Sequence, residues 1–195
     1  MIKEYRQERL KGKFIVEWQP GRDIHDPQFR YNGFKQETTV LPKGWQKDPG
    51  QLPLPCEILY ERDVAIPLRD GTTVYADVFR PVTDEKVPAL FASTMFGKFG
   101  SYLCLDDIPG RNGVPEGSLS GLQSWEAPDP AWWVPRGYAM VNVDIRGVGS
   151  SEGNACYFGS QDADDNYDII EFLGTRDWCN GKVAMVGNSW LAITQ

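Results

Sequence analysis

A serine flanked by small residues stands near the end of the sequence, in the run Gly-Asn-Ser-Trp-Leu-Ala at positions 187–192. A serine on a sharp turn between a buried strand and a helix forms a nucleophile elbow. Gly187 and Ala192 are small enough to let the strand end and the helix start approach closely. Such a turn would expose the hydroxyl of Ser189 and direct the backbone amide of Trp190 toward a developing oxyanion. These residue types predict nucleophilic attack on an ester or amide carbonyl.

The six residues alone leave a second interpretation open. Leu191 occupies the last position of the general pattern Gly-x-Ser-x-Gly, so that pattern is not met. Ser189 could instead be the N-cap of a helix, a position at which serine is favoured. The choice between a nucleophile and a helix cap depends on the elements around the serine.

Strand and helix patterns lead up to this serine. Continuous apolar runs at 87–94, 138–144 and 182–187 predict buried strands. Residues 162–174 predict a helix, because acidic residues crowd the first turn and apolar residues recur on one face. Strand, helix and strand in this order favour a βαβ unit in a parallel sheet. A serine directly after the last strand fits the elbow.

Further upstream, the pattern predicts a hairpin and then a long loop. Two strand-like runs at 58–68 and 72–80 flank Arg-Asp-Gly at 69–71, which favours an antiparallel hairpin. Residues 97–136 are rich in glycine and proline, and loops of this length are often functional. Its tryptophans at 125, 132 and 133 could line an acyl pocket, although packing in the core is the default expectation.

The composition is that of a folded domain. The chain has 195 residues, 41 % of them hydrophobic, which is too many for a disordered chain. Its 20 basic and 27 acidic residues give a net charge of −7, and the basic residues are scattered, which argues against nucleic acid as a partner. No apolar run approaches the roughly 20 residues of a membrane span. The charged N-terminus does not resemble a secretory signal, so a cytoplasmic location is expected.

The residue types for metal or cofactor binding are missing. The four cysteines contain no Cys-x-x-Cys pair, and the chain has one histidine, so neither a zinc site nor a redox pair is expected. Reduced, mostly buried thiols are the expectation for Cys56, Cys104, Cys156 and Cys179. Glycines at 147–153 have the spacing Gly-x-Gly-x-x-x-Gly rather than Gly-x-Gly-x-x-Gly. We therefore expect no organic cofactor, and no phosphate loop supports a nucleotide-binding Rossmann domain.

Four further motifs precede the serine in the sequence. They are Ile-Pro-Leu-Arg-Asp-Gly at 66–71, Ala-Asp-Val-Phe-Arg-Pro at 76–81, Asp-Ile-Arg-Gly at 144–147 and Asn-Gly-Lys-Val at 180–183. With the run around Ser189 they resemble the X-Pro dipeptidyl-peptidase and cocaine-esterase-like (CocE/NonD) family of serine hydrolases. The resemblance implies an incomplete α/β-hydrolase fold: an antiparallel hairpin leads into a mostly parallel sheet that ends at the nucleophile elbow.

The resemblance also implies roles for individual residues. Ser189 falls on the family's nucleophile, and the amide of Trp190 falls on one oxyanion donor. The family's second donor is a tyrosine hydroxyl after the third strand, and in the segment Thr-Met-Phe-Gly-Lys at 94–98 this position is Phe96. Phenylalanine has no hydroxyl, and losing one such donor typically costs on the order of 100- to 1000-fold in turnover. Tyr102 lies nearby in the sequence. Substrate-binding residues are not identified.

Three other candidate residues are not expected to be catalytic. In the family pattern, the segment with Asp144 and Arg146 shapes the loop after a central strand, and Arg146 is expected to pair with a carboxylate. His25 lies in an expected exposed turn and precedes the serine. In α/β-hydrolases the acid and then the histidine follow the serine, so His25 is not expected to be the base.

The sequence therefore predicts a serine hydrolase of esters, amides or peptides that forms an acyl-enzyme on Ser189. The triad's acid and histidine are expected beyond residue 195, and the resemblance implies a helical cap and a β-sandwich there. Residues 1–55 are expected to be an irregular aromatic-rich arm, and 56–195 the N-terminal part of the catalytic domain. Its partner would be a small-molecule ester, amide or peptide substrate. The alternative is a catalytically silent fragment or a binding module.

Overall fold

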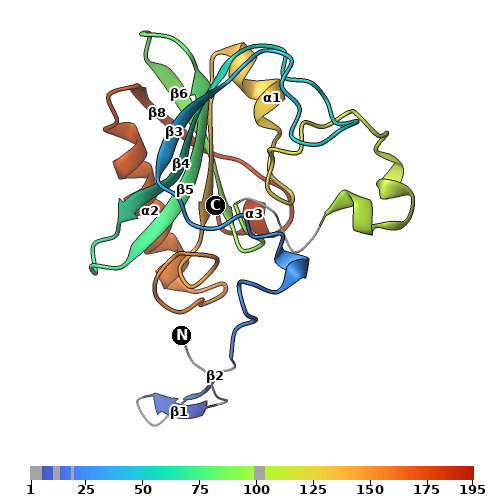
Figure 1. Cartoon of the computed structure of the whole chain (residues 1–195). Coiled ribbons are helices and arrows are strands. Elements are labelled where there is room, and N and C mark those ends of the chain that lie inside the picture. Colours follow the sequence, from blue (N-terminus) through green and yellow to red (C-terminus); the bar gives the residue numbers. More distant parts are fainter. Residues whose placement is uncertain (1–5, 11–13, 19, 99–103) are drawn as a thin grey trace.

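A six-stranded mixed sheet organises the computed structural model, which describes residues 6–10, 14–18, 20–98 and 104–195 (Figure 1). In sheet order the strands are β3 (Glu37–Leu41), β4 (Ile58–Pro67), β5 (Thr73–Pro81), β7 (Ala139–Asp144), β6 (Val87–Thr94) and β8 (Cys179–Met185). A separate antiparallel pair is formed by β1 (Arg6–Leu10) and β2 (Phe14–Trp18).

The pairing confirms the predicted hairpin and βαβ unit. β4 and β5 are antiparallel and are joined by a turn in which Gly71 has φ +88°. β5 then pairs antiparallel with β7, whereas β7 with β6 and β6 with β8 are parallel. The parallel part of the sheet is thus limited to three strands in the described chain. Their carboxyl ends meet at one edge, where ligands bind in α/β folds.

β3 departs from the expectation of an irregular arm. The run Glu-Thr-Thr-Val-Leu at 37–41 pairs antiparallel with β4 and is the first strand of the main sheet. As an edge strand it is mostly exposed, with only Leu41 buried, so the alternation that marks a half-buried strand is weak in its sequence. The division of the chain at residue 55 stays a prediction.

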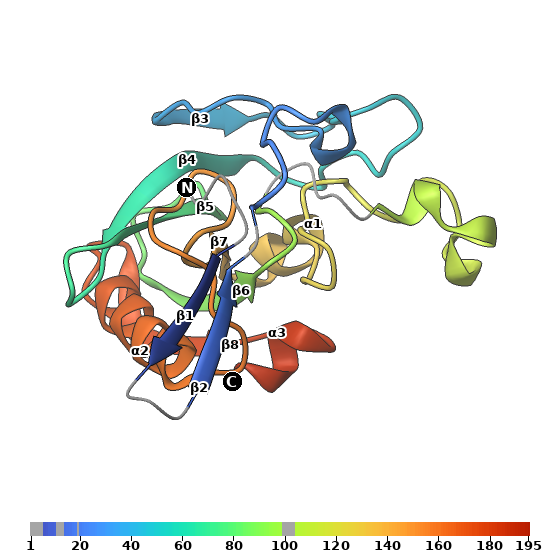
Figure 2. The ribbon, with the colours of Figure 1, turned by 90° about the horizontal axis from the view of Figure 1, so that it is seen from below.

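Helices cover both faces of the sheet (Figures 1 and 2). The long helix α2 (Ser160–Gly174) packs on one face, where Ile169 and Leu173 join the buried side chains of β5, β6 and β7. The opposite face carries α1 (Pro130–Trp133) and α3 (Trp190–Ile193). Short 3₁₀ turns complete the chain: η1 (Pro27–Phe29), η2 (Leu105–Asp107), η3 (Pro109–Gly113) and η4 (Val134–Arg136).

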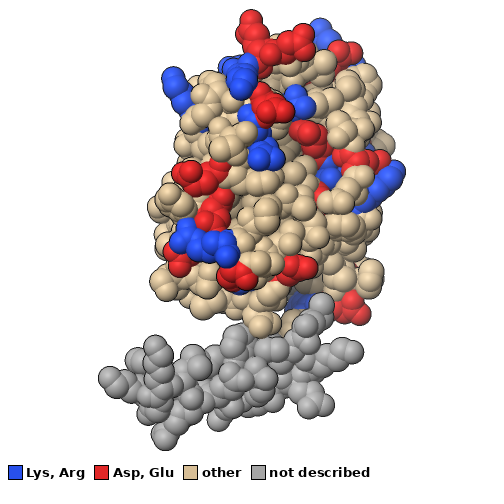
Figure 3. Space-filling view, turned by 90° about the vertical axis from the view of Figure 1, so that its left-hand side faces the viewer, with Lys and Arg blue, Asp and Glu red and all other residues tan. Residues whose placement is uncertain are grey.

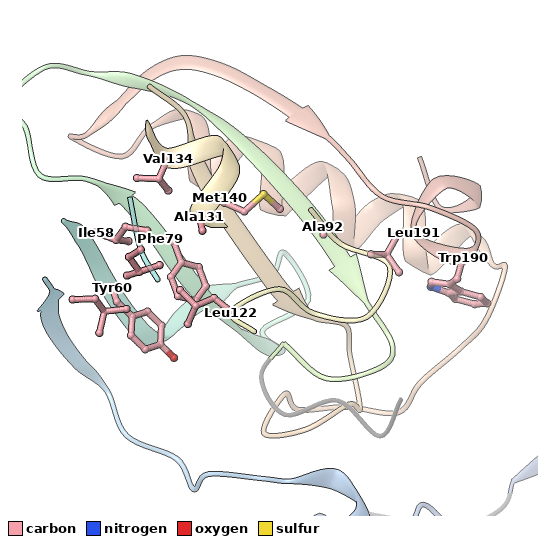
Figure 4. Packing of buried hydrophobic residues seen from close by; sticks show 12 residues of the cluster. Ile58, Tyr60, Phe79, Ala92, Leu122, Ala131, Val134, Met140, Trp190 and Leu191 are labelled. Carbon is pink, nitrogen blue, oxygen red and sulfur yellow. The ribbon is translucent and has the colours of Figure 1, made fainter. Parts of the chain in front are cut away.

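One hydrophobic cluster joins the sheet to the elbow (Figure 4). Phe79 and Met140 from the sheet pack with Leu122 from the long loop and with Leu191 from α3, and all four are almost fully buried. Burying a side chain of this size stabilises the fold by about 1.5–3 kcal/mol. The position of α3 therefore depends on this cluster rather than on the intrinsic stability of four residues.

The expectation of core tryptophans in the long loop is wrong for Trp132, whose side chain is 57 % exposed. Its ring lies under the guanidinium of Arg136, 3.5 Å from the ring centroid, and this contact covers one face of the indole. Trp125 and Trp133 are half-buried. Tyr102 lies outside the described residues.

Candidate active site

Ser189 occupies the turn between β8 and α3. Its backbone has φ +52° and ψ −117°, a left-handed conformation that an L-residue adopts only at a cost of about 1–3 kcal/mol. The side chain is exposed, and its hydroxyl makes no hydrogen bond to any described residue. Its oxygen therefore does not cap α3, in contrast to the helix-cap interpretation. A strained backbone and a free, exposed hydroxyl are the geometry of a nucleophile elbow.

The close approach predicted at this turn exists, but it involves Gly187 and Leu191 rather than Gly187 and Ala192. A Cβ on Gly187 would overlap with the Cβ of Leu191, which shows that glycine is required there. Ala192, which the sequence analysis expected to face the strand, is exposed instead. The single glycine leaves enough space for leucine at the position where the general pattern has a second glycine.

The backbone amide of Trp190 is the first N–H of α3. The N–H groups of Leu191 and Ala192 donate to the carbonyls of Asn188 and Ser189, at 3.0 Å each. The N–H of Trp190 has no acceptor in the described part of the chain, which leaves it available to an anion at the helix start. The indole of Trp190 is buried against Phe158, with 4.3 Å between ring centroids.

The structure brings Phe96 to the same region. β6 lies beside β8, so the segment after β6 begins at the same sheet edge as the elbow. The ring of Phe96 packs against the hydrophobic cluster that contains Trp190 and Leu191. Its backbone N–H donates to Thr94 Oγ1 at 3.0 Å and is therefore not free to serve as an oxyanion donor.

A buried lysine that the sequence analysis did not single out fixes this segment. Lys98 is 5 % exposed, and its Nζ lies 2.6 Å from Asp63 Oδ1 and 3.0 Å from Asp77 Oδ1. Its backbone N–H donates to Asp144 Oδ1 at 2.5 Å. We call Lys98, Asp63, Asp77 and Asp144 the lysine–aspartate cluster. It ties the segment after β6 to β4, β5 and β7.

The charges of this cluster perturb one another strongly. Burial raises the pKa of Asp144 to about 7, with Lys98 opposing the rise and Asp77 and Asp63 adding to it. Burial favours the neutral amine of Lys98, but the carboxylates of Asp77 and Asp144 outweigh this effect and raise its pKa. The hydroxyl of Tyr60 donates to Asp77 Oδ2 at 2.9 Å, and burial raises the pKa of that phenol.

Arg146 pairs with a carboxylate, as the sequence analysis predicted. Its guanidinium donates to both oxygens of Asp165 in α2, at 2.8 and 2.7 Å, and lies 2.9 Å from Asp70 in the β4–β5 turn. The hydrogen bond from Arg146 lowers the pKa of Asp70 to about 2. Arg146 thus joins α2 to the β4–β5 turn.

His25 lies in an exposed turn, as predicted. Its backbone N–H donates to Asp23 Oδ1 at 2.9 Å, and its ring makes an edge contact with Tyr31. In the described residues, no three His, Cys, Asp or Glu side chains converge in a way that could hold a metal ion. No helix among these residues is long and apolar enough to cross a bilayer.

A cavity of about 700 Å³ opens beside the elbow. The long loop forms much of its wall, including Ser124, Trp125 and Glu126, and Asn188 lines it from the elbow. The backbone N–H of Asn188 donates to the carbonyl of Glu126 at 3.1 Å, which links the wall directly to the residue before Ser189. Pockets of this size suit small-molecule ligands. The sequence offered only the tryptophans as a signal for this cavity.

The chain is similar in sequence to known proteins. Residues 70–195 match the family described as X-Pro dipeptidyl-peptidase (S15 family). Cocaine esterase from Rhodococcus sp. (strain MB1 Bresler) is 30 % identical over 135 residues, which are 68 % of this chain and 20 % of that protein. A putative Xaa-Pro dipeptidyl-peptidase from Streptomyces avermitilis is 32 % identical over 74 residues, 30 % of this chain and 11 % of that protein.

A solved structure has the same fold. The CocE/NonD family hydrolase from Staphylococcus aureus superposes with a TM-score of 0.64 at 33 % identity, over 71 % of this chain and 24 % of that protein. The chain therefore spans about a fifth to a quarter of the length of these two larger relatives. The α/β-hydrolase fold is confirmed, while the roles of Ser189, Trp190 and Phe96 stay predictions.

Proposed function

Because the chain belongs to the X-Pro dipeptidyl-peptidase (S15) family, we propose that it carries the nucleophile of a serine hydrolase that cleaves ester, amide or peptide bonds. The observation that supports this most strongly is the backbone of Ser189 at φ +52° on a strand–helix turn, with its hydroxyl exposed. Residues are held in such strained conformations mainly where function requires them.

In the proposed reaction, Ser189 Oγ attacks the substrate carbonyl carbon and loses its proton to a general base. The carbonyl oxygen becomes an oxyanion, which the N–H of Trp190 stabilises at the start of α3. The leaving alcohol or amine takes the proton from the base, and an acyl-enzyme remains on Ser189. Water then hydrolyses this ester and restores the hydroxyl.

The base and its orienting acid are proposed to come from residues outside this sequence. No acidic residue or histidine follows Ser189 in the chain, and His25 lies before it in an exposed turn. A triad in the family's order requires both groups after the serine. Residues 56–195 would then be the N-terminal part of the catalytic domain.

Phe96 favours a second candidate, a catalytically silent module that keeps the fold. At the expected position of a donor hydroxyl the chain has a phenyl ring, and its N–H is already bonded to Thr94. A binding protein would tolerate this loss, whereas a hydrolase would have to replace the donor or accept a slower turnover.

A fluorophosphonate probe separates the two candidates, because it reacts with an activated serine. The test uses the longest product of the open reading frame that contains this sequence, followed by mapping of the labelled peptide. Labelling at Ser189 that disappears in Ser189→Ala supports the hydrolase. A folded full-length protein without labelling at Ser189 contradicts the hydrolase and supports the silent module.

A further inference from the structure

A small cavity of about 10 Å³ lies between α2, α3 and the carboxyl ends of β6 and β7. Three polar side-chain atoms of its wall are buried without a hydrogen-bond partner among the described residues: Asp162 Oδ2, Trp190 Nε1 and Thr194 Oγ1. Asp162 lies in the first turn of α2, Trp190 begins α3, and Thr194 is the C-cap of α3. Trp190 is only 8 % exposed. Buried polar groups nearly always have a partner, so three unpartnered atoms around one cavity call for an explanation.

The rest of the wall does not supply that partner. Asp165 accepts hydrogen bonds from Arg146 at 2.8 and 2.7 Å and from Gln161 at 2.9 Å. Asn166 Nδ2 donates to the backbone carbonyl of Thr194 at 3.0 Å, which links α2 directly to the end of α3. The apolar part of the wall consists of Val74, Ile145 and Ile169. The polar side chains of α2 are thus engaged elsewhere, and the apolar side chains offer no hydrogen bond.

The three unpartnered atoms restrict the chemistry of a common partner. An indole N–H only donates a hydrogen bond, an ionised carboxylate only accepts one, and a hydroxyl does either. A metal cation or an ammonium group cannot accept from the indole of Trp190, and a halide ion cannot donate to Asp162. A water molecule does both, and buried waters typically make about three hydrogen bonds.

The size and the charge of the cavity agree with water as the partner. A volume of about 10 Å³ is close to the smallest that holds one water molecule, and it excludes larger polar ligands. Burial raises the pKa of Asp162, whereas the backbone N–H groups of Gly159 and Phe158 oppose the rise. A further donor at Oδ2 would favour the ionised carboxylate in the same way.

From this complementarity we propose that the cavity is a binding site for one water molecule. The water accepts a hydrogen bond from Trp190 Nε1, donates one to Asp162 Oδ2 and has Thr194 Oγ1 as its third partner. It thereby joins the first turn of α2 to both ends of α3, a helix of four residues that depends on tertiary contacts for its position. Water binding requires no reactive serine, so this proposal goes beyond the proposed function and can fail independently of it.

A high-resolution crystal structure of the longest product of the open reading frame that contains this sequence tests the site. We expect one isolated electron-density peak in the cavity, within about 3.2 Å of Asp162 Oδ2, Trp190 Nε1 and Thr194 Oγ1. A cavity without a peak would overturn the proposal, as would an indole N–H that donates directly to the carboxylate of Asp162. Contacts of about 2.4 Å, which are typical of a bound metal ion, would also contradict it.

Two variants assign the peak to the named atoms. In the double variant Trp190→Phe with Thr194→Val, Asp162 is the only one of the three partners that remains, and a buried water needs at least about two polar partners. The peak should therefore be absent. Thr194→Ser is the matched control, because it keeps the hydroxyl and should keep the peak. A peak that survives in the double variant, or that is lost in Thr194→Ser, contradicts the assignment.

Discussion

At the scale of single residues, the elbow depends on steric fit around one serine. Ser189 takes a left-handed backbone, and Gly187 leaves the space that the side chain of Leu191 fills. The hydroxyl is exposed, and the N–H of Trp190 lies at the start of the helix without an acceptor among the described residues. The family resemblance predicts a second oxyanion donor at the position of Phe96, and a phenyl ring has no hydroxyl to donate.

Phe96→Tyr should therefore restore a missing function in the full-length protein. If the hydroxyl reaches the oxyanion, kcat should rise by about 100-fold or more, because one donor of this kind is typically worth 100- to 1000-fold. The measurement is steady-state hydrolysis of a p-nitrophenyl ester, with Phe96→Leu as the control that changes the ring without adding a donor. An unchanged kcat in Phe96→Tyr would show that the phenyl position is not the donor position.

At the scale of elements, the lysine–aspartate cluster connects four segments behind the site. Asp63 comes from a bulge in β4, Asp77 from β5 and Asp144 from the end of β7, and Lys98 follows β6. All four residues are at least 95 % buried. Attraction between Lys98 and the aspartates offsets much of the free-energy cost of burying these charges, but only while every member is present. The loop that carries Phe96 is thereby tied to the sheet.

Lys98→Met should destabilise the chain by about 3–5 kcal/mol, because it leaves buried carboxylates without their cation. Urea denaturation followed by circular dichroism measures this loss. Lys86→Met is the matched control, since Lys86 is exposed and its loss should change the unfolding free energy by less than about 0.5 kcal/mol. Equal effects of the two substitutions would mean that the buried ion pairs of Lys98 add nothing to the unfolding free energy beyond what an exposed lysine adds.

The same cluster predicts a pH dependence. The pKa of Asp144 is about 7 in the folded chain, above the ordinary value of 3.8, so the folded state binds the proton more tightly. Its contribution to stability is therefore present below pH 4 and is lost as the pH rises from about 4 to 7. Asp144→Asn mimics the protonated form. It should therefore remove the contribution of Asp144 to the pH dependence of the unfolding free energy, a slope of up to about 1.4 kcal/mol per pH unit.

Urea denaturation at several pH values gives the wild-type and Asp144→Asn curves, and their difference isolates this group. Asp70 and Asp168 have lowered pKa values and act in the opposite direction at lower pH, but they are common to both proteins and cancel in the difference. A difference that does not change between pH 4 and 7 would contradict a raised pKa at Asp144.

At the scale of the whole molecule, the sheet ends on a strand with an open side. β8 pairs with β6, and no other described strand lies beside it, while most of its residues are exposed or half-exposed. The face drawn in Figure 3 shows basic and acidic side chains interspersed rather than separated into one-sign patches. The open edge of β8 offers unpaired backbone N–H and C=O groups that a second copy of the chain could pair with.

An open edge strand predicts self-association of the 195-residue chain. Sedimentation velocity over a range of concentrations should show reversible growth in mass. Ala184→Lys adds a charge in the middle of β8, where Ala184 is exposed, and should weaken association by about 10-fold. A wild-type chain that stays monomeric at every concentration would contradict the prediction.

The sequence by itself determined the fold class, the hairpin and the βαβ unit, and it predicted a strand–helix turn at Ser189. These depend on local signals: apolar runs, a turn at Asp-Gly, and small residues around one serine. It also predicted that Arg146 would pair with a carboxylate, and Asp165 supplies it. Local patterns carry this information because secondary structure repeats over a few neighbouring residues.

Only the tertiary structure decided which distant residues meet. β3 has too little alternation to be recognised, and it becomes a strand by pairing with β4. Nothing in the sequence distinguishes Lys98 from a surface lysine. Only the fold surrounds it with three aspartates from separate strands. The cavity with Glu126 likewise forms from segments far apart in the chain. Burial and charge compensation arise from packing in three dimensions, which no local pattern specifies.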